Sequence, residues 1–286
     1  MEESTFKNMN GLKIFTRAWR PKEKETGVIV IVPGFNSHGG YYSWVADRLV
    51  ENGFAAYAID LQGRGRSDGK RFFVSSFDDY VSDVNEFIKL IKSKEPDLPV
   101  FILGHSAGGV VSCLYTINNQ IELAGLICES FAFHLPAPGF ALAAFKGLEH
   151  IAPNSHFLRL KNENFSRDPE VIEFMNNDPL IAGESQPTQT LAELVRADDY
   201  LKNNLKLITL PVLILHGTGD KAAKVSGSEY FYENTNSTDP TLKIYEGGYH
   251  DLLNDIIKEE VMHDVLSWIG KRINDGKKSS VVSAKS

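Results

Sequence analysis

The feature that most constrains the fold of this chain is a serine between glycines, Gly104-His105-Ser106-Ala107-Gly108, set between two apolar runs. Residues 100–103 are all apolar, which predicts a short buried strand, and residues 110–115 can open a helix. A Gly-x-Ser-x-Gly sequence between a strand and a helix is the turn called a nucleophile elbow, in which the serine is conformationally strained. The pattern therefore predicts that the Ser106 hydroxyl projects from the carboxyl end of a sheet. The alternative is a glycine-rich turn whose serine only caps the helix.

Strand-like and helix-like segments alternate on both sides of this turn. Residues 27–32 form an unbroken β-branched run, typical of a central strand covered on both faces. Residues 12–19 alternate between apolar and polar side chains and end before Pro21, as an edge strand would. Further strands are predicted at 54–59, 123–128, 211–216 and 241–245, with helices at 41–52, 77–92, 224–235 and 251–273. This order predicts an α/β fold with a mostly parallel sheet flanked by helices.

The alternation stops between residues 130 and 205. This stretch holds six prolines and no strand-like run; its first part is rich in Phe, Leu and Ala, and the rest is polar with short helical pieces. We expect a core made of residues 1–129 and 206–273, with residues 130–205 inserted as a helical cap, or lid, at the carboxyl edge of the sheet. Residues 274–286 are rich in Lys and Ser, lack an apolar face and are expected to be disordered.

The net charge and the length of the apolar runs limit the kinds of partner that the protein can have. A net charge of −7 gives no electrostatic reason to expect a nucleic acid. The apolar runs are shorter than the roughly 20 residues that span a bilayer, and the acidic first residues lack the apolar core of a secretory signal. Cys113 and Cys128, both in apolar runs, are expected to be buried reduced thiols. We therefore expect a cytoplasmic protein.

A serine nucleophile needs a base, normally a histidine held by a carboxylate. When the serine sits on such an elbow, the chain order is Ser, then Asp or Glu, then His, with the last two on loops after later strands. Of the eight histidines, only His250 lies on a loop directly after the last predicted strand. The others precede the serine, lie in the cap, end a strand or sit inside the last helix: His38, His105, His134, His150, His156, His216 and His263. His250 is therefore the predicted base.

The predicted acid is Asp220, which closes the loop after the strand at 211–216. It would fix the tautomer of His250 and stabilise the imidazolium. Four other aspartates are candidates for the same role, but only because of their residue type. They lie in the cap, in a turn before a strand, or next to the histidine, where a helix cap is the simpler role: Asp198, Asp199, Asp239 and Asp251.

Acyl transfer also requires donors for the oxyanion. One predicted donor is the backbone N–H of Ala107, directly after the serine. The second should come from the loop after the strand at 27–32, where the backbone N–H of Phe35 follows Pro33 and Gly34. Both are main-chain roles, so only position along the chain supports them.

A loop at residues 60–69 contains two closely spaced glycines, Gly63 and Gly65. A dinucleotide site would need a third glycine where Asp68 stands, and a helix to follow. The arginines of this loop, Arg64 and Arg66, are expected to pair with carboxylates. No cluster of Cys and His offers a metal site, so we expect neither metal nor organic cofactor.

Taken together, these segments resemble the monoacylglycerol lipase and lysophospholipase branch of the α/β-hydrolase fold. The resemblance covers about residues 11–268 and rests on the elbow, the 60–69 loop, Asn177-Asp178-Pro179-Leu180-Ile181, the Asp220 loop and the segment 242–250. Two motifs depart from the usual pattern: Pro33-Gly34 replaces His-Gly, and Ser106-Ala107-Gly108-Gly109 replaces Ser-Met-Gly-Gly. Both departures leave the backbone donors in place.

The resemblance implies a serine ester hydrolase for monoacylglycerols or related lipid esters, with transient contact between cap and membrane. Five apolar residues could line a groove for the acyl chain, although each could instead belong to the core: Phe131, Phe133, Leu135, Phe140 and Phe145. Three alternatives stay open: a carboxylesterase for short or aromatic acids, which the bulk of Phe35 favours, a lysophospholipase, and a ligand-binding protein of this fold without turnover. The oligomeric state is not predicted.

Overall fold

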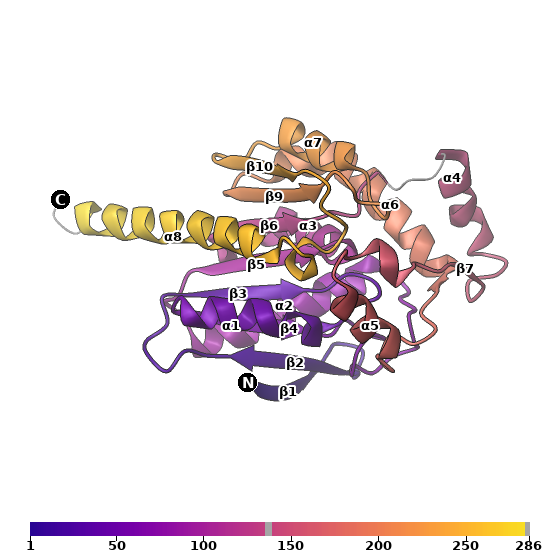
Figure 1. Cartoon of the computed structure of the whole chain (residues 1–286), viewed down its shortest axis with the longest axis horizontal. Helices are drawn as coiled ribbons and strands as arrows, with labels where there is room; N and C mark the ends of the chain where they lie inside the picture. Colours follow the sequence, from indigo (N-terminus) through magenta and orange to yellow (C-terminus); the bar gives the residue numbers. More distant parts are fainter. Residues whose placement is uncertain (135–138, 284–286) are drawn as a thin grey trace.

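The computed structural model describes residues 1–134 and 139–283, with side chains at all of these positions except 140–143 and 275–283. An eight-stranded sheet runs through the molecule, with helices on both faces (Figure 1). The predicted α/β fold class is confirmed. In chain order the strands of this sheet are β1 (Glu2–Lys7), β2 (Lys13–Trp19), β3 (Gly27–Val32), β4 (Phe54–Ile59), β5 (Val100–His105), β6 (Gly125–Glu129), β9 (Val212–Gly217) and β10 (Pro240–Tyr245).

The spatial order of the strands is β1-β2-β4-β3-β5-β6-β9-β10. The pairs β1–β2 and β2–β4 are antiparallel, and all other neighbours in this sheet are parallel. The prediction that residues 12–19 form an edge strand is wrong, because β1 pairs outside β2. The strand β1 was not predicted. Five of its six residues are exposed, so its sequence does not alternate between apolar and polar side chains.

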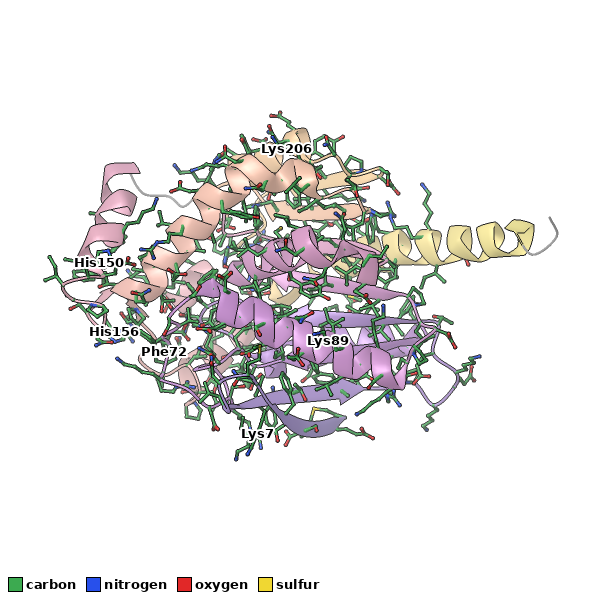
Figure 2. All side chains as sticks on the ribbon, turned by 180° about the vertical axis from the view of Figure 1, so that it is seen from behind. Lys7, Phe72, Lys89, His150, His156 and Lys206 are labelled. Atoms are coloured by element: carbon green, nitrogen blue, oxygen red, sulfur yellow. The ribbon has the colours of Figure 1, made fainter. Side chains whose placement is uncertain are left out.

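Alternate residues of the buried strands pack into two separate cores, one on each face of the sheet. Val28, Val30 and Val32 of β3 pack into one core with α2 (Phe77–Lys94), α3 (Ala107–Asn119) and α7 (Val225–Asn234). Ile29 and Ile31 pack into the other core with α1 (Ser43–Glu51) and α8 (Lys258–Ser283). Figure 2 shows the face that carries α2, with Lys89 on that helix. A strand buried on both faces in this way explains the unbroken β-branched sequence of β3.

The two cysteines lie in the first of these cores, on α3 and β6. Cys113 and Cys128 are both buried and free, with their Sγ atoms 3.6 Å apart. The predicted buried reduced thiols are confirmed.

The segments between residues 130 and 205 gather at one end of the sheet (Figure 1). They include α4 (Gly139–Leu148), α5 (Pro169–Asn177) and α6 (Thr188–Asn204). Figure 2 labels His150 and His156, which lie at this same end, opposite α8. The expectation of no strand here is wrong: β7 (His156–Leu158) pairs with β8 (Gln186–Pro187). The division of the chain into core and cap stays a prediction.

The last helix differs in its bounds from the predicted 251–273. Residues 252–254 form a separate 3-10 turn, η5 (Leu252–Asn254), and α8 begins only at Lys258. From there α8 continues to Ser283, past the residue at which the disordered tail was predicted to start, and it extends away from the end that carries α4 (Figure 1). Asp251 is therefore the N-cap residue of η5 and not of α8, and its side chain makes no capping hydrogen bond there. Within the described part of the chain, no helix is both long and apolar enough to cross a bilayer.

Candidate active site

The turn after β5 holds Ser106 in a strained conformation. Its φ is 55° and its ψ is −120°, a region that residues other than glycine rarely occupy. The flanking glycines are needed because the chain is crowded there: a Cβ on Gly108 would lie 2.0 Å from the carbonyl oxygen of Val32, and one on Gly104 would lie 2.5 Å from that of Gly108. The predicted strained turn between strand and helix is confirmed.

The structure brings Ser106, His250 and Asp220 into one hydrogen-bonded chain. Ser106 Oγ lies 2.7 Å from His250 Nε2, and His250 Nδ1 lies 2.7 Å from Asp220 Oδ2. The three residues follow β5, β10 and β9, so they meet at the carboxyl edge of the parallel strands. His250 is 1% exposed and Ser106 6% exposed, so the chain of contacts is shielded from solvent. Their catalytic roles stay predictions.

Asp220 is held in its charged form. Burial alone would raise the pKa of this carboxyl, but the nearby His250 and His216 outweigh burial and hold the pKa well below its ordinary value. The other oxygen, Oδ1, accepts the N–H groups of Ala222 and Ala223 at 2.7 and 3.0 Å. A fixed carboxylate of this kind can orient an imidazole and stabilise its protonated form.

His216 is a second histidine on the same carboxylate. Its Nε2 lies 3.0 Å from Asp220 Oδ2, and its Nδ1 lies 2.7 Å from Ser228 Oγ. When the Ser228 hydroxyl donates to Nδ1, the Nε2–H of a neutral His216 faces the carboxylate. Sequence analysis interprets His216 only as a structural residue at the end of a strand. Its position four residues before Asp220 is the signal that could have indicated this contact.

The four rival aspartates bind other partners in the described structure. Asp198 accepts the N–H of His134, Asp199 pairs with Lys146, and Asp239 pairs with Arg272. Asp251 accepts from the side-chain amide of Asn254 at 3.0 and 3.1 Å. Among the described residues, Asp220 is thus the carboxylate hydrogen-bonded to the His250 ring.

The two predicted oxyanion donors lie on either side of Ser106. Ala107 begins α3, so its N–H has no partner within the helix. The loop after β3 approaches from the other side, since a Cβ on Gly34 would lie 2.8 Å from Ser106 Cβ. Within the described structure the Phe35 N–H has no acceptor, whereas the next N–H, that of Asn36, donates to Glu184 Oε1 at 2.9 Å. These positions are compatible with the predicted donor pair.

The Phe35 ring packs against a buried ion pair. The Arg64 guanidinium carbon lies 4.0 Å from the centre of that ring, and Arg64 pairs with Glu184. Phe35 is 3% exposed and belongs to the core. Its bulk is therefore packed beneath Arg64, and the carboxylate that binds Arg64 also binds the backbone of the Phe35 loop. The sequence predicted that Arg64 and Arg66 pair with carboxylates, and this is confirmed for both, with Glu184 and Glu3.

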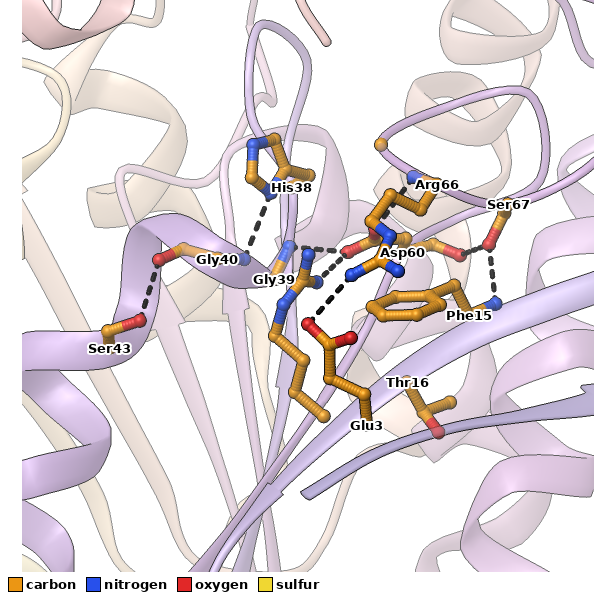
Figure 3. A network of polar contacts seen from close by, with 12 residues as sticks. Glu3, Phe15, Thr16, His38, Gly39, Gly40, Ser43, Asp60, Arg66 and Ser67 are labelled. Atoms are coloured by element: carbon orange, nitrogen blue, oxygen red, sulfur yellow. Dashed lines mark hydrogen bonds and ion pairs between the residues drawn. The ribbon is translucent and has the colours of Figure 1, made fainter. Parts of the chain in front are cut away.

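Asp60, at the end of β4, ties the same loop to the sheet (Figure 3). Its Oδ1 accepts the Gly39 N–H at 2.8 Å and pairs with Arg17 at 2.7 Å, and its Oδ2 accepts the Arg66 N–H at 2.9 Å. The carboxylate is fully buried, and these donors satisfy it. The loop after β3 and the loop at residues 60–69 are thus fixed to each other.

A second contact joins this loop to the predicted cap. His38 Nε2 lies 2.8 Å from Asp178 Oδ2, and the Tyr41 hydroxyl donates to the same oxygen at 2.8 Å. Asp178 belongs to the Asn-Asp-Pro-Leu-Ile segment on which the family resemblance rests in part. Its contact with His38 could not be read from the sequence.

The predicted substrate-binding residues lie in different environments. Phe131 and Phe133 are fully buried and stack on each other with ring centres 5.2 Å apart. Phe145, on α4, is partly buried, with its ring centre 6.1 Å from that of Phe157. Leu135 and the side chain of Phe140 lie outside the described residues. Contact of these residues with substrate stays a prediction.

One group of side chains has the composition of a metal site. His105, Glu129 and Asp251, all buried, offer ligand atoms within 4.8 Å of one another. The carboxylates already serve protein donors: Glu129 Oε1 accepts the Leu253 N–H at 2.9 Å, and both oxygens of Asp251 accept from Asn254. We therefore assign no metal to this group. It lies behind His250, whose carbonyl oxygen is 3.2 Å from His105 Nε2.

Comparison with known proteins places the chain among hydrolases. The model of the family described as "Serine aminopeptidase, S33" matches residues 23–257. The chain is 30% identical to a monoacylglycerol lipase of Mycolicibacterium smegmatis over 269 residues, which are 93% of this chain and 96% of the relative. It is also 30% identical to a caffeoylshikimate esterase of Arabidopsis thaliana over 289 residues, covering 95% and 86% of the two chains.

A solved structure agrees with these relatives. The crystal structure of the Paleococcus ferrophilus monoacylglycerol lipase superposes with a TM-score of 0.82 at 26% identity, covering 91% of this chain and 99% of the other.

Proposed function

The chain belongs to the α/β-hydrolase family described as serine aminopeptidase, S33, and we propose that within this family it hydrolyses carboxylic esters, with monoacylglycerols and similar lipid esters as substrates. The observation that carries the proposal is the chain of contacts from Ser106 through His250 to Asp220, at 2.7 Å each, behind a strained elbow. Nucleophile, base and orienting carboxylate in this order are the parts of an acyl-transfer site.

The first half of the proposed reaction acylates the enzyme. Ser106 Oγ attacks the ester carbonyl while His250 Nε2 takes the hydroxyl proton. The N–H groups of Phe35 and Ala107 hold the oxyanion of the tetrahedral intermediate. Asp220 keeps the proton on His250 Nδ1 and stabilises the imidazolium. His250 then gives its Nε2 proton to the leaving alcohol, and the acyl group remains on Ser106.

The second half releases the acid. A water molecule replaces the alcohol, and His250 removes its proton as the oxygen attacks the acyl carbonyl. The same two N–H groups hold the second oxyanion. Collapse of this intermediate returns the proton to Ser106 and frees the carboxylic acid. Each step uses residues of this chain alone.

The relatives and an exposed apolar surface support the substrate class. The Mycolicibacterium relative and the Paleococcus structural neighbour described above are both named monoacylglycerol lipases. Several large apolar side chains of the predicted cap are exposed: Ile151, Phe157, Leu158 and Phe174. Such side chains would let the cap touch a lipid surface transiently while substrate enters. The cytoplasmic location stays a prediction of the sequence.

A second candidate is an esterase for small aromatic acids. The Arabidopsis relative is named for such an ester, and its coverage of this chain is as high as that of the lipase. The bulk of Phe35, which favours this candidate in the sequence, packs beneath Arg64 in the core, so the support for this candidate comes from the relative. A lysophospholipase would use the same chemistry with a different alcohol group.

The test is hydrolysis of p-nitrophenyl esters from acetate to palmitate, beside 1-monoacylglycerol and methyl caffeate, by the wild type and by Ser106→Ala. We expect the highest kcat/KM on medium or long chains and on monoacylglycerol, and its loss in the variant. A maximum on acetate, butyrate or caffeate would replace the lipase assignment with a small-substrate esterase. Equal inactivity of both proteins on every ester would favour a ligand-binding protein without turnover.

A further inference from the structure

Glu129 is a buried carboxyl that the proposed reaction does not use. It is the last residue of β6, the strand between β5, which leads into Ser106, and β9, which leads into the Asp220 loop. In the sheet register it stands opposite His105 on one side and Leu215 on the other. Its side chain is fully buried in a sequence, Leu-Ile-Cys-Glu, that is otherwise apolar. A carboxyl at such a place is costly unless its polar atoms are satisfied.

The main chain at Glu129 holds the elbow. Its carbonyl oxygen accepts the N–H of Ser106 at 2.9 Å, and the N–H of the following residue, Ser130, donates to the Leu215 oxygen at 2.8 Å. The backbone around Glu129 therefore fixes the nucleophile against the strand that carries the predicted acid.

The side chain of Glu129 holds the third segment. Its Oε1 accepts the N–H of Leu253 at 2.9 Å, in the turn η5 that starts two residues after His250. Leu253 is fully buried, so without this acceptor its N–H would be left unpaired. A single residue thus touches the segments that carry Ser106, Asp220 and His250.

We propose that Glu129 is a positioning residue for His250: its carboxyl clamps the η5 turn and thereby fixes the imidazole at hydrogen-bond distance from Ser106. His105 assists from the other side, because its Nε2 lies 3.2 Å from the carbonyl oxygen of His250. The inference rests on the roles proposed above for Ser106 and His250. A displacement of the imidazole by about 1 Å costs about 100-fold in rate without preventing substrate binding.

The surroundings of Glu129 favour the neutral form of its carboxyl. Burial, with the adjacent Asp251 carboxyl adding to it, raises the pKa of Glu129 well above its ordinary value. The raised pKa favours the protonated carboxyl, in which Oε1 accepts as a carbonyl oxygen. A carboxamide has the same shape, the same acceptor and no charge, so glutamine should replace glutamate here.

The experiment compares Glu129→Met, which removes the acceptor, with Glu129→Gln, which keeps it. On p-nitrophenyl butyrate at pH 7.5, the methionine variant should lose about 10- to 100-fold in kcat with KM changed less than about twofold. The glutamine variant should keep kcat within about threefold of the wild type. Should the methionine variant not fold, Glu129→Ala gives the same comparison.

The matched control is Asp83→Leu. Asp83, on α2, is another buried carboxyl whose pKa burial raises, here to about 7, and its Oδ1 accepts from Asn8 at 2.9 Å. Its loss should lower the melting temperature and leave kcat of the folded protein unchanged.

Two results would overturn the positioning role: full kcat in folded Glu129→Met, or a glutamine variant as slow as the methionine variant. Ser106→Ala separates this from the proposed function. A fully active Ser106→Ala would refute the proposed function itself, whereas the two results above, in an enzyme that needs Ser106, refute only the role of Glu129.

Discussion

The core side and the cap side of the proposed active site are held in different ways. On the core side, Ser106, Asp220 and His250 follow the parallel strands β5, β9 and β10, and hydrogen bonds to the main chain of β6 and β9 and to the Glu129 side chain fix their loops. On the cap side, residues 130–205 contact the core mostly through side chains, among them the pairs Arg64–Glu184, His38–Asp178 and Arg167–Asp255. Main-chain bonds are fewer there, such as the one from the Asp251 N–H to the Phe165 oxygen at 2.8 Å.

This difference separates two tasks. Sheet hydrogen bonds define positions to a fraction of an ångström, which acyl transfer requires, while ion pairs can break and form again as a cap adapts to its ligand. We therefore expect core-side changes to act on kcat, and cap-side changes to act on stability, substrate range and surface binding.

The largest effect should come from the proposed triad. Asp220→Asn leaves a side chain of the same size but removes the charge that orients His250, so kcat should fall by about 10⁴-fold. His250→Gln should cost at least as much. End-point hydrolysis assays, with the Ser106→Ala protein as the blank, measure these residual rates. A loss of less than tenfold in Asp220→Asn would mean that another group orients the imidazole, and His216→Gln would then be the next variant.

The next effect tests the strongest cap-side pair. Glu184→Leu leaves the Arg64 guanidinium buried without its counter-charge, which should lower the free energy of unfolding by about 3–5 kcal/mol. Denaturant titration measures this change. Lys89→Met serves as the control, because its pair with Glu86 lies on the surface and contributes about 0.5 kcal/mol or less. Equal effects of the two variants would show that the Arg64–Glu184 pair does not fasten the cap.

A smaller effect concerns the exposed apolar residues of the cap. Phe157→Ser should reduce co-sedimentation with phosphatidylcholine vesicles about 5- to 10-fold, because a half-exposed phenyl ring contributes a part of the roughly 1.5–3 kcal/mol of a buried one. Ile121→Ser is the matched control: Ile121 is 90% exposed but lies outside the predicted cap. If both variants bind vesicles alike, the cap is not the membrane-facing surface.

The smallest effect compares two helical glycines. A Cβ at Gly270 of α8 or Gly147 of α4 would meet no atom within 4 Å, so alanine fits at both. Each substitution should stabilise its own helix by up to about 1 kcal/mol through helix propensity, and the melting of the core should register this only for Gly270. Thermal melts should show the gain at Gly270. A gain of the same size at Gly147 would mean that α4 unfolds together with the core, contrary to a loosely attached cap.

The sequence predicted what has a strong local signal. Strand β3 could be read from its β-branched run, and the turn at Ser106 from its glycines. Asp220 and His250 could be chosen because the order of strands fixes which loops meet at one edge of a parallel sheet. These are consequences of chain order and need no knowledge of distant contacts.

The rest depends on contacts between residues far apart in the sequence. Glu129 and Leu253 meet across 124 residues, and Arg64 and Glu184 across 120. Strand β1 is exposed and polar, so only its pairing with β2 defines it. The helix α6 is polar on its outer face, and its buried side, with Leu194 and Leu201, is visible only against the core. No local pattern carries this information.

The most direct test of the central claim is covalent labelling with a fluorophosphonate ester, followed by peptide mass mapping. Attack by an activated serine should attach one phosphonyl group per chain, on the peptide that contains Ser106, with parallel loss of esterase activity. Ser106→Ala should take up no label, and His250→Gln should react far more slowly. A label on another residue, or full labelling of His250→Gln, would contradict the account that Ser106 is the nucleophile activated by His250.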